Sequence, residues 1–559
     1  MYFAASRERN IFDFYLRSSK RLGSIRSNNM GVGSKSSDFL LFFLCLLIRH
    51  RSRGENVLLV PTSCAESHWF MLAKVGQALV GRGHDVTAVV PEDIAEKRRA
   101  ERPDFKFETF NDQGTSALGK KFVDHYHTHM TETSFYQYAK GAIILSEVVT
   151  KHCDLLLKDV DMMSRLKAAK PSVIIYDAYS PIGAILAAHM DVRVPLIAIM
   201  VGRADHYFLD IKATGIPLAL SYVPFVGFNF TDHMTFVQRV QNVVAFTLAP
   251  MLGRWLASNT YDGLVRKYVS EKETIQSVVS KTDLWLRQFD HILDFPGPSM
   301  PNMVQIGGSH IGAVSPLPEV LEAFFQSAGD EGVIVVSFGS GAKAMSLERR
   351  EIFAAAFARL RQKVVWRYVG ERPTGLGNNT KLLDWLPQND MLGHPGTRVF
   401  ITHAGSSGVY EALHHGVPMV CLPLTADQPG NAARVVARGL GVKLDFSTFT
   451  TDQLYQAIVH ILTNNSYREN AARLSRLYRD QPQPPMERAV WWIEHAIKHC
   501  RLSHLRARAV DLPWYQYYLL DVAAFLMAVC SAAIGTVWYS CFLVCKKSCY
   551  ENGGKLKSQ

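Results

Sequence analysis

Residues 385–428 read WLPQNDMLGHPGTRVFITHAGSSGVYEALHHGVPMVCLPLTADQ, and this stretch decides the fold. It contains two short apolar runs, residues 399–402 and 418–424, and each ends where a Gly-rich or acidic turn begins. Parallel strands with ligand-facing loops at their carboxyl ends have this pattern. Between the runs, the small residues at 403–408 open a helix, and they allow a phosphate to approach the free N–H groups of its first turn. The stretch therefore predicts an α/β fold that holds a diphosphate.

Length and composition favour two domains and argue against a nucleic-acid surface. A chain of 559 residues exceeds what one core usually organises, and 48% hydrophobic residues can fill two. The net charge of +11 belongs to the ends, because residues 1–53 hold ten Lys or Arg against three Asp or Glu, and residues 546–559 hold four Lys against one Glu. The body is nearly neutral, so we expect no nucleic-acid partner. The linker-like FPGPSMPNM at 295–303 places a domain boundary between residues 54–298 and 299–515.

The spacing of cysteines, histidines and acids predicts neither a disulfide framework nor a metal site. The nine cysteines form no CxxC pair, and reduced thiols are expected. His125, His127 and His129 alternate and so share no single helical face, which favours a solvated loop or helix end. Asp159 and Asp161 have an Asp-x-Asp spacing found in metal sites, but they fall in an expected helix and are interpreted as surface residues.

The two ends of the chain carry targeting and membrane signals. Residues 39–48 are ten consecutive apolar residues, too short for a span and suited to the core of a signal peptide that begins at Met30 within residues 1–53. Residues 1–29 then form an upstream extension. Residues 49–53 make a poor cleavage site, so a retained anchor is the alternative.

Residues 522–545 carry no formal charge and predict a transmembrane helix. Lys546 and Lys547 follow at once, so the positive-inside rule makes residues 546–559 cytosolic and the body lumenal, a single-pass type I topology. Three glycosylation sequons would be modified only on that side, at Asn229, Asn378 and Asn464.

Two residues in the first half stand where α/β folds place working side chains. His68 follows a first strand at 56–61, and Asp177 ends a buried strand at 171–177. A carboxylate there can hold one imidazole nitrogen while the other takes a proton. The alternatives are a structural helix cap for each residue, and Asp154 competes with Asp177 as the partner.

The whole stretch at 385–428 resembles the signature segment of the UDP-glycosyltransferases of animal endoplasmic reticulum, and SHWF at 67–70 followed by RGHDV at 82–86 resembles the family's catalytic segment. The resemblance implies a GT-B fold, with two facing Rossmann-like domains. Residues 54–298 would bind the acceptor. Residues 299–515 would bind the UDP-sugar and include C-terminal helices that cross back over the first domain. It also implies a location in the endoplasmic reticulum membrane.

The resemblance also implies the role of each site residue. His68 is the catalytic base and Asp177 orients it. In the donor site Trp385 stacks on the uracil, Gln388 and Glu411 hold the nucleoside, and Asp427 and Gln428 bind the sugar hydroxyls. The residues expected around the diphosphate are Ser340, His403, Gly405, Ser406, Ser407 and Gly408. One displacement then inverts the anomeric centre and gives a β-glycoside, with the UDP-sugar as co-substrate and with no cofactor or metal required.

The choice of donor sugar rests on fewer residues. The Asp427-Gln428 pair resembles glucuronosyl and glucosyl members, so we expect transfer of glucuronate to a small lipophilic acceptor. CDLLL, DHMT, SPLPE, LGNNTKL and WLPQND resemble the animal ceramide galactosyltransferase, which makes hexosyl transfer to a lipid such as ceramide the alternative.

Departures from the family pattern leave a second alternative. Ala404 and Ser407 depart within the phosphate loop, and Thr425 and Gly430 depart near the sugar residues. These departures leave the alternative that the protein is an inactive membrane protein that binds a nucleotide sugar and partners an active relative. Homo- or hetero-oligomers with related transferases would be compatible with an active enzyme and with an inactive partner.

Overall fold

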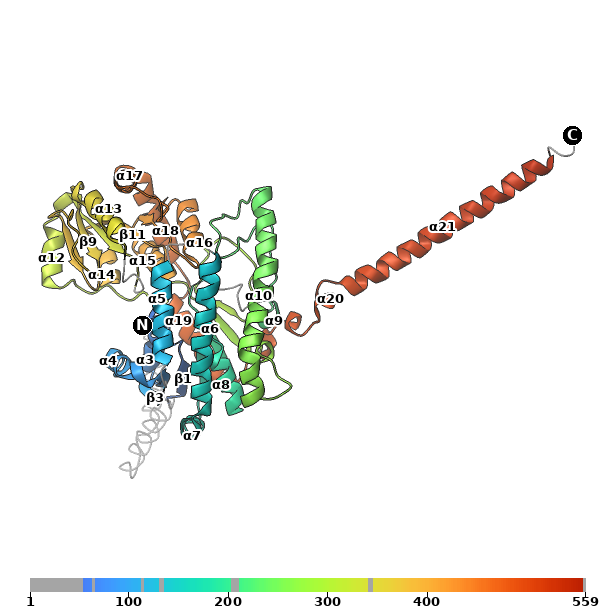
Figure 1. The fold of residues 1–559 in the computed structure, drawn as a ribbon, viewed down its shortest axis with the longest axis horizontal. Coiled ribbons are helices and arrows are strands. Elements are labelled where there is room, and N and C mark those ends of the chain that lie inside the picture. Colours follow the sequence, from blue (N-terminus) through green and yellow to red (C-terminus); the bar gives the residue numbers. More distant parts are fainter. Residues whose placement is uncertain are drawn as a thin grey trace, which may run out of the picture. The chain divides into compact units, whose positions relative to one another are not determined.

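The structure is a computed structural model that describes residues 54–62, 66–111, 115–129, 135–202, 211–339 and 345–555. Residues from Glu55 onward form a compact unit that contains two parallel sheets (Figure 1). The predicted signal peptide and Ser340 lie outside the described residues.

The first sheet has the strand order β3-β2-β1-β4-β5-β6-β7, and every neighbouring pair is parallel. Its strands are β1 (Asn56–Val60), β2 (Asp85–Pro91), β3 (Lys106–Phe110), β4 (Val173–Asp177), β5 (Leu196–Met200), β6 (Leu284–Arg287) and β7 (Met303–Gln305). β4 and β5 are buried at every position, as strands of a parallel sheet covered on both faces must be.

Helices of the first half are α3 (Glu66–Gly81), α4 (Glu92–Glu101), α5 (Thr115–His129), α6 (Phe135–Lys158), α7 (Val160–Ala168), α8 (Ile182–Met190), α9 (Ile211–Thr214), α10 (Phe236–Tyr268) and α11 (Ile275–Val279). Figure 1 shows α6 running alongside both α5 and α10, and α6 is in contact with each of them. His125 lies near the end of α5, and the Asp159 side chain caps the start of α7 by accepting a hydrogen bond from the backbone N–H of Met162.

The second sheet has the order β10-β9-β8-β11-β12-β13 and is also parallel throughout. Its strands are β8 (Val333–Ser337), β9 (Lys363–Arg367), β10 (Thr380–Leu383), β11 (Thr397–Thr402), β12 (Met419–Cys421) and β13 (Gly441–Lys443). The two apolar runs of the deciding stretch form β11 and β12. Because β7 belongs to the first sheet, the chain passes from one sheet to the other between Gln305 and Val333, and the division at 298 stays a prediction.

Helices of the second half are α12 (Glu319–Gln326), α13 (Leu347–Ala358), α14 (Gln388–Gly393), α15 (Ser406–His415), α16 (Gln428–Ala437), α17 (Thr451–Thr463), α18 (Asn465–Arg479), α19 (Pro485–His499), α20 (Trp514–Tyr517) and α21 (Leu520–Lys555), with 3₁₀ turns η1 (Gly329–Glu331), η2 (Ser503–Leu505) and η3 (Arg508–Val510). α19 returns to the first sheet, where Ala489, Val490 and Ile493 join the core that lies beneath α3.

Both sheets reverse their strand order at an internal strand. The chain moves outward from β1 to β3 and then restarts on the other side at β4, and it repeats this from β8 to β10 and then β11. Such switch points leave a crevice at the carboxyl ends of the two central strands, where ligands of α/β folds bind. The fold therefore provides two places for a site, one after β1 and β4 and one after β8 and β11.

In the part of the chain that is described, α21 is the one helix long and apolar enough to cross a membrane, over residues 520–548. It includes the predicted span at 522–545, and its side chains are exposed. The three sequon asparagines are also exposed.

Candidate active site

The first switch point brings together His68 and Asp177. His68 lies in the first turn of α3, which follows β1, and Asp177 is the last residue of β4. The imidazole Nδ1 lies 2.8 Å from Oδ2 of Asp177, and Oδ1 of Asp177 accepts a hydrogen bond from the backbone N–H of Tyr179 at 3.0 Å. Asp154, the alternative partner for His68, instead accepts hydrogen bonds from Lys267 and Tyr268 at the surface.

Ionisation at this pair is set by a contest between burial and charge. Burial lowers the pKa of His68, but the charge of Asp177, its hydrogen bond and the charge of Asp427 outweigh burial, so the pKa lies above its ordinary value. Burial alone would raise the pKa of Asp177, but the charge and the hydrogen bond of His68 lower it by more. The pKa of Asp177 therefore lies below its ordinary value, and Asp177 stays ionised. With Nδ1 engaged, Nε2 of His68 is the nitrogen able to accept a proton.

Asp427 connects the two sheets at this point. It stands directly before α16 in the second half, and its Oδ2 accepts a hydrogen bond from Asn431 at 3.0 Å. Gly202, two residues beyond β5, has φ +80°, and a Cβ built there would lie 3.1 Å from Oδ2 of Asp427. A glycine at 202 thus supplies both the left-handed backbone and the room for this approach. From this position, the charge of Asp427 in the second half contributes to the raised pKa of His68 in the first half.

At the second switch point, α15 presents its N-terminus beside His403. The N-cap residue Gly405 provides no side-chain hydrogen bond, so the first-turn N–H groups at Ser406, Ser407 and Gly408 are not capped by a side chain. The ring of His403 fits against two glycines, since a Cβ on Gly339 or Gly405 would collide with it. Burial, and secondarily the charge of Arg367, lowers the pKa of His403 to about 4. His403 is therefore neutral at pH 7.

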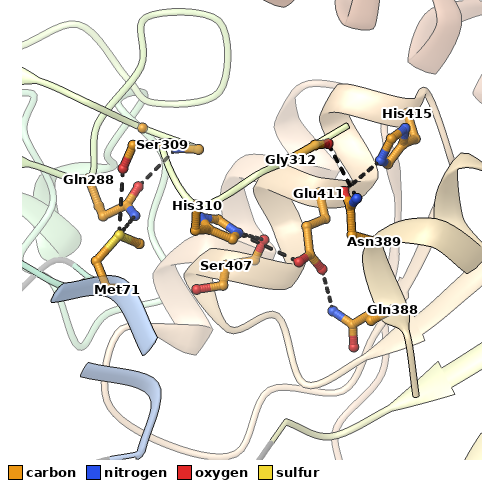
Figure 2. A network of polar contacts seen from close by, with 12 residues as sticks. Met71, Gln288, Ser309, His310, Gly312, Gln388, Asn389, Ser407, Glu411 and His415 are labelled. Carbon is orange, nitrogen blue, oxygen red and sulfur yellow. Dashed lines mark hydrogen bonds and ion pairs between the residues drawn. The ribbon is translucent and has the colours of Figure 1, made fainter. Parts of the chain in front are cut away.

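Glu411 lies one turn further along α15, in a polar network (Figure 2). Its Oε2 accepts a short hydrogen bond from Nε2 of Gln388 at the start of α14. Its Oε1 lies 3.7 Å from Nε2 of His310, and the same nitrogen lies 3.2 Å from the carbonyl oxygen of Ser407. Burial raises the pKa of Glu411 to about 7, although the bond from Gln388 opposes the rise.

His310 belongs to a segment that joins the two half-sites. Figure 2 shows it between the side chains of Ser407 and Glu411 on one side and Ser309 on the other. Next to it, Ser309 Oγ lies 3.5 Å from Sδ of Met71, one turn beyond His68 on α3. The segment at 307–312 therefore contacts both the helix that carries His68 and the helix that carries Glu411.

Trp385 has a side chain 59% exposed, although it stands between two folded elements. The guanidinium of Arg367 lies 5.1 Å from its ring centroid, and Phe70 of α3 lies 5.9 Å away, centroid to centroid. Arg367 also donates from Nη1 to the carbonyl of Gly339, and its buried Nε has no hydrogen-bond partner among the described residues. A partly exposed indole beside a fixed cation suits an aromatic, anionic ligand.

The side chains of Gln428 and Ala404 both make contacts within the fold. The Gln428 carbonyl accepts hydrogen bonds from the backbone N–H groups of Leu424 and Thr425, at 2.9 and 3.1 Å, which leaves its amide nitrogen as the donor for a ligand. Ala404 is fully buried with φ 61°, and its methyl group packs in the second core. The Ala404 methyl group is thus part of the core of the second half.

Three residues with clear positions in this site were not predicted from the sequence: Gly202, His310 and Arg367. Gly202 and Arg367 follow or end ordinary strands. His310 contacts a residue 97 positions away, which only the fold brings close. The one available clue was a polar residue at the end of a buried strand, and it applied to Arg367, the last residue of β9.

The fold defines the class of protein. The structure is similar to that of the glycosyltransferase VinC in complex with DTDP, with a TM-score of 0.54 and 16% sequence identity, over 79% of this chain and 100% of that one. Two parallel sheets of this kind are the GT-B fold of glycosyltransferases, as predicted.

Sequence comparison identifies the family. The family model described as UDP-glucoronosyl and UDP-glucosyl transferase matches residues 55–556. The chain is similar to UDP-glucuronosyltransferase 2C1 of Oryctolagus cuniculus, 36% identical over 88% of this chain and 99% of that protein. It is similar to the same degree to UDP-glucuronosyltransferase 1A1 of Rattus norvegicus, over 94% and 98%. The chain belongs to the UDP-glycosyltransferase family, which confirms the resemblance and makes it an enzyme with a nucleotide-sugar donor.

Proposed function

We propose that this chain transfers glucuronate from UDP-glucuronate to a hydroxyl of a lipophilic acceptor and gives a β-glycoside. The observation that carries the proposal is the 2.8 Å pair of His68 and Asp177, within reach of the charge of Asp427. The two relatives named above match over most of their length and are glucuronosyltransferases, which supports this sugar.

The reaction uses His68 as general base. The acceptor hydroxyl gives its proton to Nε2 of His68, and its oxygen forms a bond to the anomeric carbon. The bond from that carbon to the β-phosphate oxygen breaks, and its electron pair leaves with UDP. Asp177 stabilises the imidazolium, as a buried carboxylate does where it is hydrogen-bonded to a histidine that acts as general base. No step needs a further reactant.

The second half-site would hold the donor. Glu411 and Gln388 bind the ribose, Trp385 stacks on the uracil, and the N–H groups at the start of α15 meet the diphosphate with neutral His403. Asp427 and the amide nitrogen of Gln428 contact the sugar. In this division residues 54–298 bind the acceptor and residues 299–515 bind the UDP-sugar.

The test is UDP release from microsomes that contain this chain or His68→Ala, with UDP-glucuronate, UDP-glucose and UDP-galactose each offered beside phenols, steroids and ceramide. Turnover with UDP-glucuronate that is lost in the variant supports the proposal. Turnover with ceramide and a UDP-hexose would support the alternative, hexosyl transfer to a lipid. Folded protein that binds UDP and turns over no donor would be an inactive binding partner.

We also propose that the protein is a single-pass type I protein of the endoplasmic reticulum membrane, with α21 as its anchor and residues 546–559 in the cytosol. The exposed Asn229, Asn378 and Asn464 would then carry glycans. Endoglycosidase H should increase the gel mobility of the microsomal protein, and each Asn→Gln variant should remove one step. A protein without any glycan that is digested by external protease would contradict this topology.

A further inference from the structure

α16 carries a series of buried polar side chains that begins at the proposed sugar contact. Nδ2 of Asn431 donates to Oδ2 of Asp427 at 3.0 Å and to the carbonyl oxygen of Ala404 at 3.0 Å. Nη1 of Arg434 donates to Oδ1 of Asn431 at 3.1 Å. Asn431 and Arg434 are 4% and 2% exposed, so these hydrogen bonds are shielded from solvent.

The three hydrogen bonds of Asn431 are compatible with one orientation of its amide. Its nitrogen faces two oxygen acceptors, and its oxygen faces a guanidinium. Rotation of the amide by 180° would set its oxygen against the Asp427 carboxylate and the Ala404 carbonyl, and its NH₂ group against Arg434. The amide therefore releases Asp427 only by losing all three hydrogen bonds.

The carboxylate of Asp427 is confined from a second direction. The backbone at Gly202 approaches so closely that a Cβ built there would lie 3.1 Å from Oδ2, the same oxygen that accepts from Asn431. Oδ2 is thus held between the amide of α16 and the segment that follows β5. These two contacts define the orientation of the carboxylate.

Arg434 is in turn fixed from outside the donor site. Its Nε lies 3.2 Å from Oδ1 of Asp294, and both side chains are buried. Oδ2 of Asp294 accepts a hydrogen bond from the hydroxyl of Tyr410 at 2.8 Å. Replacing a buried ion pair by neutral groups of similar size often leaves stability unchanged, because desolvation cancels the attraction. An orienting role of this pair can therefore be measured separately from stability.

We propose that Asn431 and Arg434 are positioning residues of the donor site, which hold the Asp427 carboxylate in place relative to the phosphate loop at 403–408. The inference rests on the proposed function, in which Asp427 contacts the sugar. One amide bonds both Asp427 and the Ala404 carbonyl, so it sets the sugar contact at a fixed distance from the loop. A misplaced carboxylate would weaken binding of the UDP-sugar and leave binding of UDP, which lacks the sugar, unchanged.

The double variant Arg434→Met with Asp294→Asn tests the orienting role without leaving a buried charge. The asparagine at 294 still offers an oxygen to Tyr410. We expect the KM for the UDP-sugar to rise about ten-fold, in line with the loss of one hydrogen bond to a charged group. The Kd of UDP, measured by calorimetry on the full-length protein, and the midpoint of thermal unfolding should be nearly unchanged.

Arg438→Met is the matched control, on the same helix and with the same substitution. Arg438 lies 5.8 Å from the ring centroid of Phe295, and Arg434 lies 5.6 Å from the same ring. Its hydrogen bonds go to the carbonyl oxygens of Leu293 and Asp294. Since Arg438 donates to neither side chain of the series, its variant should leave the KM for the UDP-sugar unchanged.

An exchange of acid and amide between positions 427 and 431 tests the orientation itself. In Asp427→Asn the new amide must turn its oxygen to Asn431, so an NH₂ group replaces a carboxylate oxygen at the sugar, and the KM should rise at least about ten-fold. Adding Asn431→Asp turns the amide at 427 around, because a carboxylate now accepts from it. The KM should recover at least about three-fold, and the recovery is partial because the hydrogen bond to Ala404 is lost.

The outcomes separate this inference from the proposed function. If Asp427→Ala leaves the KM for the UDP-sugar unchanged, the proposed sugar contact and this inference fail together. If Asp427→Ala raises the KM but the double variant at 294 and 434 does not, or Arg438→Met raises it equally, the inference alone fails. If the double variant does not fold, the exchange decides, and an exchange without recovery overturns the inference.

Discussion

The two half-sites stand at equivalent switch points, yet they treat an imidazole in opposite ways. At His68 the charges of Asp177 and Asp427 outweigh burial and hold the pKa above its ordinary value. At His403 burial prevails, the nearest charge is the cation Arg367, and the pKa falls to about 4. The same topology therefore gives either an imidazole that can accept a proton at neutral pH or one that stays neutral, depending on whether a carboxylate ends the neighbouring strand.

The half-sites also differ in how complete they are. The carboxylate of Asp177 has its partner and its backbone hydrogen bond within the fold. In the second half, the Nε of Arg367 and the Nδ1 of His310 are buried with no hydrogen-bond partner among the described residues. The Nε of Arg367 is a donor that suits an anionic ligand, whereas the Nδ1 of neutral His310 is an acceptor that suits a ligand donor, because its Nε2 donates to the carbonyl oxygen of Ser407. We infer that the first half-site carries the proton transfer and the second carries donor binding.

The largest effect is expected at the proton acceptor. His68→Gln retains a donor toward Asp177 but has no basic nitrogen, so kcat should fall about 10²- to 10⁴-fold. Equilibrium binding of UDP should be unchanged, measured by calorimetry on the purified full-length protein. A variant that loses UDP binding together with turnover would show that the half-sites are not separable.

A smaller effect is expected at the donor site. Glu411→Gln removes the anionic acceptor for the ribose hydroxyls, so the KM for the UDP-sugar should rise about ten-fold while kcat changes less. Initial rates at varied donor concentration measure this. Glu348→Gln, an exposed site on α13, is the matched control and should leave KM unchanged. A fall in kcat alone for Glu411→Gln would contradict the assigned role.

His310→Ala should weaken donor binding by less, because His310 acts through Ser407 and Glu411. We expect a rise of about three-fold in the KM for the UDP-sugar, in line with one lost hydrogen bond, with kcat preserved. His291→Ala, at an exposed histidine of the first half, is the control. An unchanged KM would show that the segment at 307–312 does not position the donor site.

The smallest effect is expected at Ala404. Glycine would relieve about 1 kcal/mol of left-handed backbone strain but would remove a buried methyl group of about the same value. Ala404→Gly should therefore leave the midpoint of thermal unfolding and the KM for the donor nearly unchanged. A large gain in donor affinity would show that the Ala404 methyl group does hinder the phosphates.

The sequence predicted those parts of the molecule that depend on local pattern. The strand expected at 56–61 is β1, and the strand expected at 171–177 contains β4, because an apolar run closed by a polar residue is visible in one dimension. His68 and Asp177 were both placed after such runs, with Asp154 as the competing partner, and the structure brings His68 and Asp177 together. Composition placed the domain boundary at 298, and β7 extends the first sheet to Gln305, so the exact division of the domains stays a prediction.

Positions that depend on tertiary contact could not be predicted. His310 lies outside any helix or strand, and its role follows from distances to Ser407 and Glu411. The approach of Gly202 to Asp427 joins residues more than two hundred positions apart. Ala404 departs from the family pattern in the phosphate loop, and the sequence alone could not show that its left-handed backbone turns the methyl group into the core.

The acid limb of the pH profile of kcat, measured at saturating UDP-sugar so that protonation of free Glu411 does not enter, tests most directly the division of labour between the half-sites. A neutral His68 is required, so the rate of the wild-type enzyme should fall as pH drops through a pKa above the ordinary 6.5. Asp177→Asn removes the main opposing charge while burial remains, so the limb should move to lower pH. Glu411→Gln should leave it in place. A limb that moves in Glu411→Gln, or stays in place in Asp177→Asn, would contradict the account.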